Sequence, residues 1–121
     1  MATQDLTAAT FEQTVADNDI VLIDFWADWC GPCHMFAPTY SKVSDKHSDI
    51  VFGKVDTEHE QELAGMFGIQ SIPTIAVLRD GVLLFKQAGV LPEEALEDVI
   101  AQVREVDMAE VHRQIAEQQA S

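Results

Sequence analysis

Basic side chains are scarce in this sequence of 121 residues. Only 7 residues are Lys or Arg, against 21 that are Asp or Glu, and the formal net charge is −14. Binding to nucleic acid depends on Lys and Arg side chains that neutralise phosphates. The composition therefore argues against a nucleic-acid-binding protein. We interpret the acidity as a solvated surface rather than as a surface for a specific partner.

The sequence also lacks long apolar runs. It starts Met1-Ala-Thr-Gln-Asp, without the basic start and apolar stretch of a secretory signal, and no apolar run is long enough to span a bilayer. We therefore expect no membrane association and a cytoplasmic protein in a reducing compartment. Apolar residues still make up 47% of the chain, enough for one domain with its own core. We expect this protein to be a monomer.

Cysteine occurs only twice, at Cys30 and Cys33. Two cysteines cannot complete a four-ligand zinc or iron–sulfur site within one chain, so we expect no metal. A structural disulfide across so short a loop would add little to a domain with a sufficient core. Reactivity explains the pair better, because one thiol can attack a partner's disulfide and the other can then resolve the mixed disulfide.

His34 extends the cysteine pair to Cys-X-X-Cys-His, which is also the attachment signature of c-type haem. Haem attachment normally accompanies export, and Pro32 between the cysteines fits a haem-bearing turn poorly. We therefore reject the haem interpretation. A histidine can become charged near neutral pH, so this residue leaves the pKa of Cys30 open.

Apolar periodicity predicts strands and helices in alternation. Strands are expected at residues 20–26, 51–56, 74–78 and 82–87, the last two joined by the hairpin signal Arg79-Asp80-Gly81. Helices are expected at 10–16, 33–46, 58–66 and from Pro92 onward. This order predicts an α/β sandwich built around a mixed sheet.

The helix that follows the cysteines carries one apolar stripe at helical spacing: Cys33, Phe36, Ala37, Tyr40 and Val43. Cys33 is therefore expected to face inward. Cys30 precedes the helix, where unpaired N–H groups and the positive end of the helix dipole favour a thiolate. We predict that Cys30 is the exposed nucleophile and that Cys33 is the buried resolving thiol.

Asp24 lies within the apolar run of residues 20–26. A buried carboxylate is unfavourable unless it is paired or used. We therefore predict that Asp24 is buried and that desolvation raises its pKa.

Several motifs together resemble the thioredoxin family. The run Asp-Phe-Trp-Ala-Asp-Trp-Cys-Gly-Pro-Cys at residues 24–33, followed by Pro38, resembles that family's active-site segment. Ser71-Ile72-Pro73-Thr74 is similar to its cis-proline loop, and Asp80-Gly81 with Gly89 is similar to its last hairpin and the turn beyond. The similarity extends from about Leu6 to Val103.

The resemblance implies a thioredoxin fold, with a central mixed β-sheet flanked by helices on both faces. It implies reduction of client-protein disulfides by a redox-active Cys30–Cys33 disulfide, with no bound cofactor, and re-reduction by a thioredoxin reductase, commonly an NADPH-dependent flavoenzyme. Asp24 would exchange a proton with Cys33, and Lys54 would face Asp24. The residues implied to contact clients surround the cysteines: Trp29, Gly31, Pro32, Ile72, Pro73, Gly89 and Val90.

The C-terminus extends past the family's usual fold. Asp107 and Glu110 form a capping-box pattern, which predicts a new helix near Met108. We therefore expect a thioredoxin domain at 1–106 and a helical extension at 107–121. Two other functions stay open: a disulfide oxidase or isomerase, against which Gly-Pro between the cysteines argues, and a redox-independent binding module.

Overall fold

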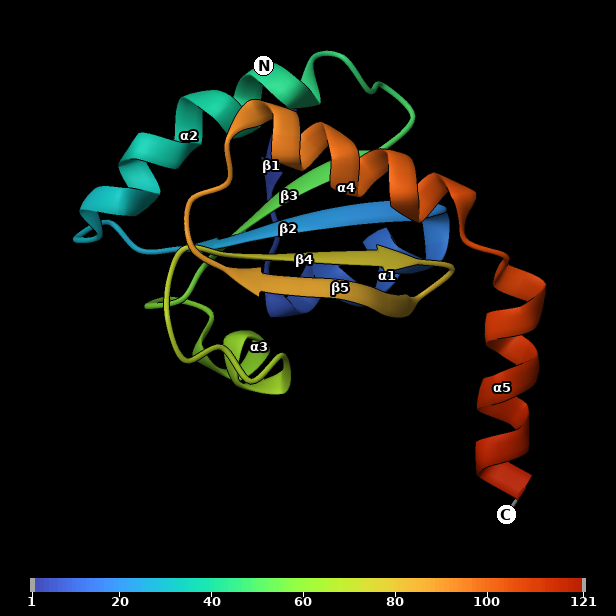
Figure 1. The fold of residues 1–121 in the computed structure, drawn as a ribbon. Helices are drawn as coiled ribbons and strands as arrows, with labels where there is room; N and C mark the ends of the chain where they lie inside the picture. The colour runs from blue at the N-terminus through green and yellow to red at the C-terminus, as the bar shows by residue number, and fades with distance from the viewer. Residues whose placement is uncertain (1, 121) are drawn as a thin grey trace.

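A computed structural model describes residues 2–120 of the chain. Its sheet has five strands in the order β1-β3-β2-β4-β5 (Figure 1). The strands are β1 (Thr3–Asp5), β2 (Ile20–Trp26), β3 (Val51–Asp56), β4 (Thr74–Arg79) and β5 (Val82–Ala88). The helices are α1 (Ala8–Asp17), α2 (Gly31–Ser44), α3 (Gln61–Met66), α4 (Glu93–Glu105) and α5 (Met108–Ala120).

The sheet is mixed, as the sequence predicts. Strands β1 and β2 are both parallel to β3, whereas β4 is antiparallel to β2 and β5 is antiparallel to β4. The central strand β2 is buried from Ile20 to Phe25. A strand covered on both faces needs apolar side chains on both sides, which explains why its sequence is a continuous apolar run.

Helices cover both faces of the sheet (Figure 1). On one face α2 and α4 contribute Phe36, Tyr40 and Ile100 to the larger core cluster. On the other face Leu63 of α3 lies in the second cluster, and Phe11 of α1 packs against it. The predicted fold class, a central mixed sheet with helices on both faces, is therefore confirmed.

The bounds of β2 and β3 are those that the sequence predicts, but the ends of other elements differ. Helix α2 begins at Gly31, two residues earlier than expected, because Cys30 caps its first turn. Helix α3 begins only at Gln61, because residues 57–59 form a turn after β3. Strand β1 was not predicted at all, since its three residues are too few to show a periodic pattern.

The guanidinium of Arg79 caps the C-terminal end of α4. Arg79 Nη1 donates to the carbonyl oxygens of Val103, Arg104 and Val106 at 3.0, 3.2 and 3.0 Å. The last carbonyls of a helix have no partner within the helix. Arg79, at the end of β4, therefore supplies these partners and fixes the corner where the chain leaves α4.

Helix α5 follows this corner and extends away from the sheet (Figure 1). Its predicted start near Met108 is confirmed, and the Asp107 carboxylate accepts the Glu110 N–H at 3.2 Å. Met108 is buried, whereas Val111 and Ile115 are only half-buried. No helix within residues 2–120 is both long and apolar enough to cross a membrane.

Candidate active site

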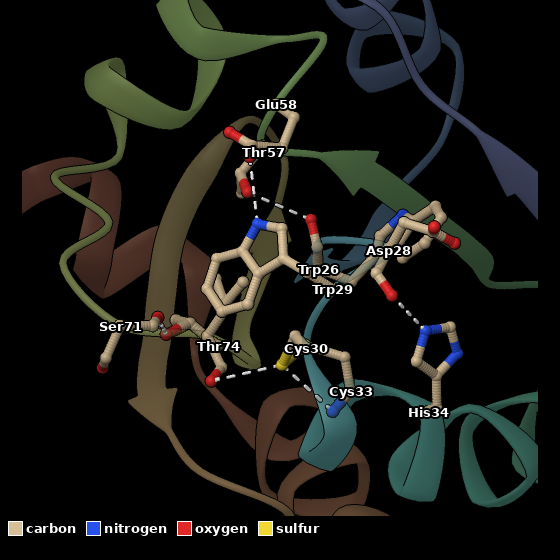
Figure 2. Close-up of a disulfide and its surroundings, with 11 residues drawn as sticks. Trp26, Asp28, Trp29, Cys30, Cys33, His34, Thr57, Glu58, Ser71 and Thr74 are labelled. Atoms are coloured by element: carbon tan, nitrogen blue, oxygen red, sulfur yellow. Dashed lines mark hydrogen bonds between the residues drawn. A yellow bond between two sulfur atoms is a disulfide. The ribbon is translucent and has the colours of Figure 1, made fainter.

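Cys30 and Cys33 form a disulfide at the start of α2, directly beyond the end of β2 (Figure 2). Cys30 is the N-cap of the helix, and its Sγ accepts the backbone N–H of Cys33 at 3.2 Å. Gly31 and Pro32 occupy the first two helical positions, where the missing N–H of proline leaves nothing unpaired. The sequence thus places one sulfur at the positive end of the α2 dipole.

The prediction that Cys30 is exposed is wrong for this disulfide form. Its exposed fraction is 3%, the same as that of Cys33. The cause is a loop distant in sequence, since Cys30 Sγ lies 3.8 Å from the carbonyl oxygen of Ile72. Cys33 does lie on the inward stripe of α2, with Phe36 and Tyr40. The two sulfurs therefore differ by position on the helix and not by burial.

The loop that covers Cys30 has the form that the resemblance implies. The Ile72–Pro73 peptide bond is cis. The carbonyl oxygen of Pro73 accepts the N–H of Gly89 at 2.8 Å, so the segment after β5 lies against this loop. Gly89 has a φ of 105°, which glycine adopts far more readily than other residues. The cis-proline loop therefore contacts the disulfide on one side and the segment after β5 at Gly89.

Trp29 stands beside the disulfide with 70% of its surface exposed. Its Nε1 donates to Oε1 of Glu58 at 2.9 Å, which holds the indole in place (Figure 2). A groove of about 560 Å³ separates the indole from the cis-proline loop. None of the side chains that line the groove is charged. The lining residues are Trp29, Thr57, Gln61, Ala64, Gly65, Ile69, Gln70, Ser71 and Ile72.

Of the predicted client-binding set, the groove lining includes Trp29 and Ile72 but not Gly31, Pro32, Pro73, Gly89 or Val90. Gly89 and Val90 are exposed, and the N–H of Gly89 binds the cis-proline loop at Pro73. The sequence analysis missed Glu58 and the groove residues of α3. No sequence pattern marks them, because they reach the site only through the tertiary fold of the segment that follows β3.

Asp24 is fully buried in the middle of β2. Within the described residues, neither of its carboxylate oxygens accepts a hydrogen bond. Burial raises the pKa of Asp24 to about 7, and the charge of Lys54 offsets part of that increase. The two residues are register partners on β2 and β3, and Lys54 Nζ lies 4.9 Å from the centre of the Trp26 ring. The predicted direction of the Asp24 pKa is confirmed.

His34 turns toward the segment that precedes the disulfide. Its Nε2 lies 2.7 Å from the carbonyl oxygen of Asp28, to which the ring N–H donates (Figure 2). The other histidines do not join it, and within residues 2–120 no group of three or more His, Cys, Asp or Glu side chains could hold a metal ion.

Comparisons with known proteins agree with this geometry. The family model described as Thioredoxin matches residues 2–102. The chain is 57% identical over 119 residues to the Streptomyces coelicolor protein named "Putative thioredoxin 2", which covers 98% of this chain and 89% of that protein. It is 39% identical over 101 residues to the thioredoxin of Bacillus subtilis, covering 83% of this chain and 96% of that one.

Solved structures are similar as well. A mutant thioredoxin from Halobacterium salinarum superimposes with a TM-score of 0.80 at 32% identity, covering 86% of this chain and 92% of that chain. Oxidised mitochondrial thioredoxin 3 from Saccharomyces cerevisiae gives 0.76 at 33% identity, covering 83% and 94%. With its Cys-X-X-Cys disulfide at the start of α2, the chain belongs to the thioredoxin family and is a thiol–disulfide oxidoreductase.

Proposed function

We propose that this protein reduces client disulfides with Cys30 as the attacking thiolate and Cys33 as the resolving thiol. The main support for this assignment is that Cys30 Sγ caps α2 and accepts the Cys33 N–H. Both the helix dipole and this hydrogen bond stabilise negative charge on sulfur, which favours the thiolate at Cys30. Cys33, inside the helix and on its inward face, lacks this position.

The electrons and protons balance in two exchanges. The Cys30 thiolate attacks one client sulfur, the client S–S bond breaks, and the other client sulfur leaves as a thiolate that takes a proton. The Cys33 thiolate then attacks Cys30, which forms the Cys30–Cys33 disulfide and releases the second client thiolate. Two electrons pass to the client, and the protein ends in the disulfide form that the structure contains.

We propose that Asp24 removes the proton of Cys33 when Cys33 becomes the attacking group, with Lys54 tuning the Asp24 charge. A pKa of about 7 supports this role, because the carboxyl group can then both take and give a proton near neutral pH. The role of Lys54 is supported by its position as the register partner of Asp24 on β3 and by the effect of its charge on the Asp24 pKa. We also propose that client segments contact the residues around the disulfide: Trp29, Gly31, Pro32, Ile72, Pro73, Gly89 and Val90.

We propose a thioredoxin reductase as the electron donor, drawing on NADPH through a flavin. A dithiol that reduces clients must itself be reduced after each turnover, which also favours the reducing cytoplasm as its compartment. We further propose that the protein acts as a monomer and that residues 1–106 form the redox domain.

Insulin reduction with dithiothreitol tests the proposed activity, and the reduction potential separates it from its alternative. Reference values for thioredoxins and protein disulfide isomerase differ by about 90 mV, or roughly 4 kcal/mol for two electrons. A potential near the thioredoxin value supports a reductase. A value near that of the isomerase, together with slow insulin reduction, would instead indicate an oxidase or isomerase.

Loss of the Glu58 side chain should release Trp29. A hydrogen bond of this kind contributes about 1 kcal/mol, so Glu58→Ala should raise KM for insulin by about threefold to tenfold and broaden the emission of the Trp29 indole. Glu58→Gln, which keeps an acceptor oxygen, is the matched control and should lie near the wild type. Equal KM values for wild type and Glu58→Ala would show that this contact does not organise the client site.

Removal of α5 should leave the chemistry intact. The disulfide lies at the start of α2, and this end of α2 and helix α5 are at opposite ends of the sheet (Figure 1). A chain that ends at Val106 should reduce insulin at the wild-type rate and lose about 2 kcal/mol of unfolding free energy, chiefly because the apolar contacts of the buried Met108 side chain are removed. Urea unfolding measures this loss, and a Met108→Ala variant of the full chain should reproduce most of it. Loss of turnover in the truncated chain would place α5 within the redox domain.

A further inference from the structure

The few cations of this chain are already engaged within it. Each of the 7 Lys and Arg side chains contacts another part of the molecule. Lys42 and Lys46 pair with Glu93, Lys54 lies over Trp26, Arg79 binds carbonyls of the α4 corner, Lys86 binds the Phe67 carbonyl, Arg104 pairs with Asp49, and Arg113 pairs with Glu110 and Glu117.

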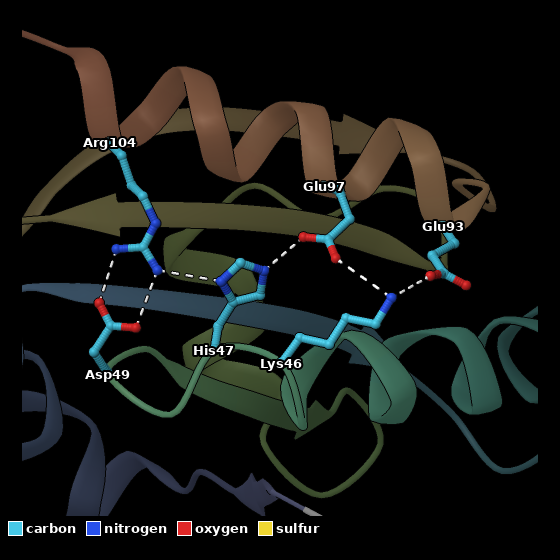
Figure 3. A network of polar contacts seen from close by, with 6 residues as sticks. All are labelled: Lys46, His47, Asp49, Glu93, Glu97 and Arg104. Atoms are coloured by element: carbon cyan, nitrogen blue, oxygen red, sulfur yellow. Dashed lines mark hydrogen bonds and ion pairs between the residues drawn. The ribbon is translucent and has the colours of Figure 1, made fainter.

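The largest of these groupings joins the residues that follow α2 to α4 (Figure 3). Lys46 Nζ lies 2.7 Å from Glu93, and Arg104 lies 2.8 Å from Asp49. His47 donates from Nε2 to Glu97 and accepts from Arg104 at Nδ1. Because these cations are matched inside the molecule, the excess charge available to a partner is negative.

The segments around the disulfide contain no Lys or Arg of their own, and Lys86 of β5 donates from Nζ to the carbonyl oxygen of Phe67 in one of them at 2.8 Å. These segments are residues 27–33, 57–62, 67–73 and 88–92. The first contains the disulfide, the second and third contribute residues to the groove, and the fourth contacts the cis-proline loop through Gly89. Asp28 precedes Trp29, and Glu58 binds its indole. His59, in the same region, lies 2.7 Å from Asp56 and is matched by it. We call Asp28 and Glu58 the acidic rim, because their carboxylates leave negative charge beside Trp29.

An uncharged groove with an acidic rim fits one kind of client segment. Apolar, amide and hydroxyl side chains line the groove. A cationic side chain at its edge would meet the carboxylate of Glu58, which binds the Trp29 indole, and Asp28, next to Trp29 in the chain, adds a second negative charge. We propose that this site selects disulfides whose cysteines are flanked by Lys or Arg. The proposal rests on the disulfide reductase function and names the class of client that it favours.

Charge complementarity of this kind acts mainly on the association rate. Steering by a surface field raises association rates by about 10-fold to 1,000-fold at low salt. The effect fades once charges are separated by more than a Debye length, about 10 Å at 0.1 M salt. Selection by the acidic rim should therefore be strong at low ionic strength and weak at high ionic strength.

The test uses three disulfide peptides that differ only at the residues flanking the cystine: Lys, Gln or Glu. The full-length reduced protein is mixed with each peptide, and tryptophan fluorescence reports its oxidation. We expect the Lys peptide to react at least about tenfold faster than the Glu peptide at low salt, with the Gln peptide between them. The ratio should fall toward one as salt is added.

Two charge variants locate the effect. Asp28→Asn removes a negative charge from the rim and should lower the Lys-to-Glu rate ratio by about twofold to threefold. Glu105→Gln removes the same charge at the last turn of α4, at the far end of the molecule from the disulfide, and should leave the ratio unchanged (Figure 1). If both variants lowered the Lys-to-Glu rate ratio equally, the overall charge of the protein would explain the preference, and a specific role of the acidic rim would be wrong.

The rates of the wild-type protein on the three peptides distinguish an error in the charge selection from an error in the proposed function. If wild-type protein reduces all three peptides at one rate at low salt, the charge selection is wrong while the reductase function stands. If it fails to reduce even the Gln peptide, the proposed function is wrong as well. A Lys preference that salt does not weaken would also contradict an electrostatic origin.

Discussion

Cys33→Ser protein should accumulate mixed disulfides with client proteins, whereas Cys30→Ser protein should not. Without Cys33 the first exchange still occurs at Cys30, but nothing resolves its product. Both variants should lose insulin turnover, since each lacks one of the two thiols. Non-reducing gels and mass spectrometry of the trapped species measure the outcome.

The order of reactivity provides an independent check on this assignment. At neutral pH an alkylating reagent should label Cys30 of the reduced protein first, because only Cys30 caps α2. The Cys30→Ser variant is the matched control, in which labelling should be slow. Faster labelling of Cys33, or clients trapped on Cys33, would reverse the proposed roles.

Asp24→Asn should stabilise the fold and slow the exchange. The pKa of Asp24 is about 7 in the folded protein, against an ordinary value of 3.8. Between these values the folded state binds more protons than the unfolded state, so stability falls as pH rises through this range and levels off above about pH 7. The full difference is roughly 4 kcal/mol. We expect a gain of about 2–4 kcal/mol at high pH, because the asparagine amide is still buried.

Unfolding in urea at several pH values measures this gain, which should shrink toward zero as pH falls to about 4. Asp28→Asn removes the same charge from an exposed side chain and should change stability by less than about 0.5 kcal/mol. Insulin reduction by Asp24→Asn should be slowed near pH 8, where Cys33 has lost its proton acceptor. A variant no more stable than the wild type at high pH would contradict the buried, unpaired carboxylate.

Features that depend on local pattern could be predicted from the sequence. The continuous apolar run of β2 defines a strand buried on both faces, and the single acid within it, Asp24, defines a buried carboxylate. The stripe of α2 places Cys33 inward. In each case the information lies within a few neighbouring residues, because helical and strand periodicity repeat over that distance.

Features that depend on contacts between distant segments were decided by the tertiary structure. Cys30 is buried because Ile72, 42 positions away, lies against its sulfur. Trp29 is held by Glu58, 29 positions away, and no spacing rule links the two. Arg79 closes α4 only because β4 ends beside that helix. The sequence alone identified the Cys-X-X-Cys pair that forms the redox disulfide, whereas packing decided what covers the disulfide and which charges surround it.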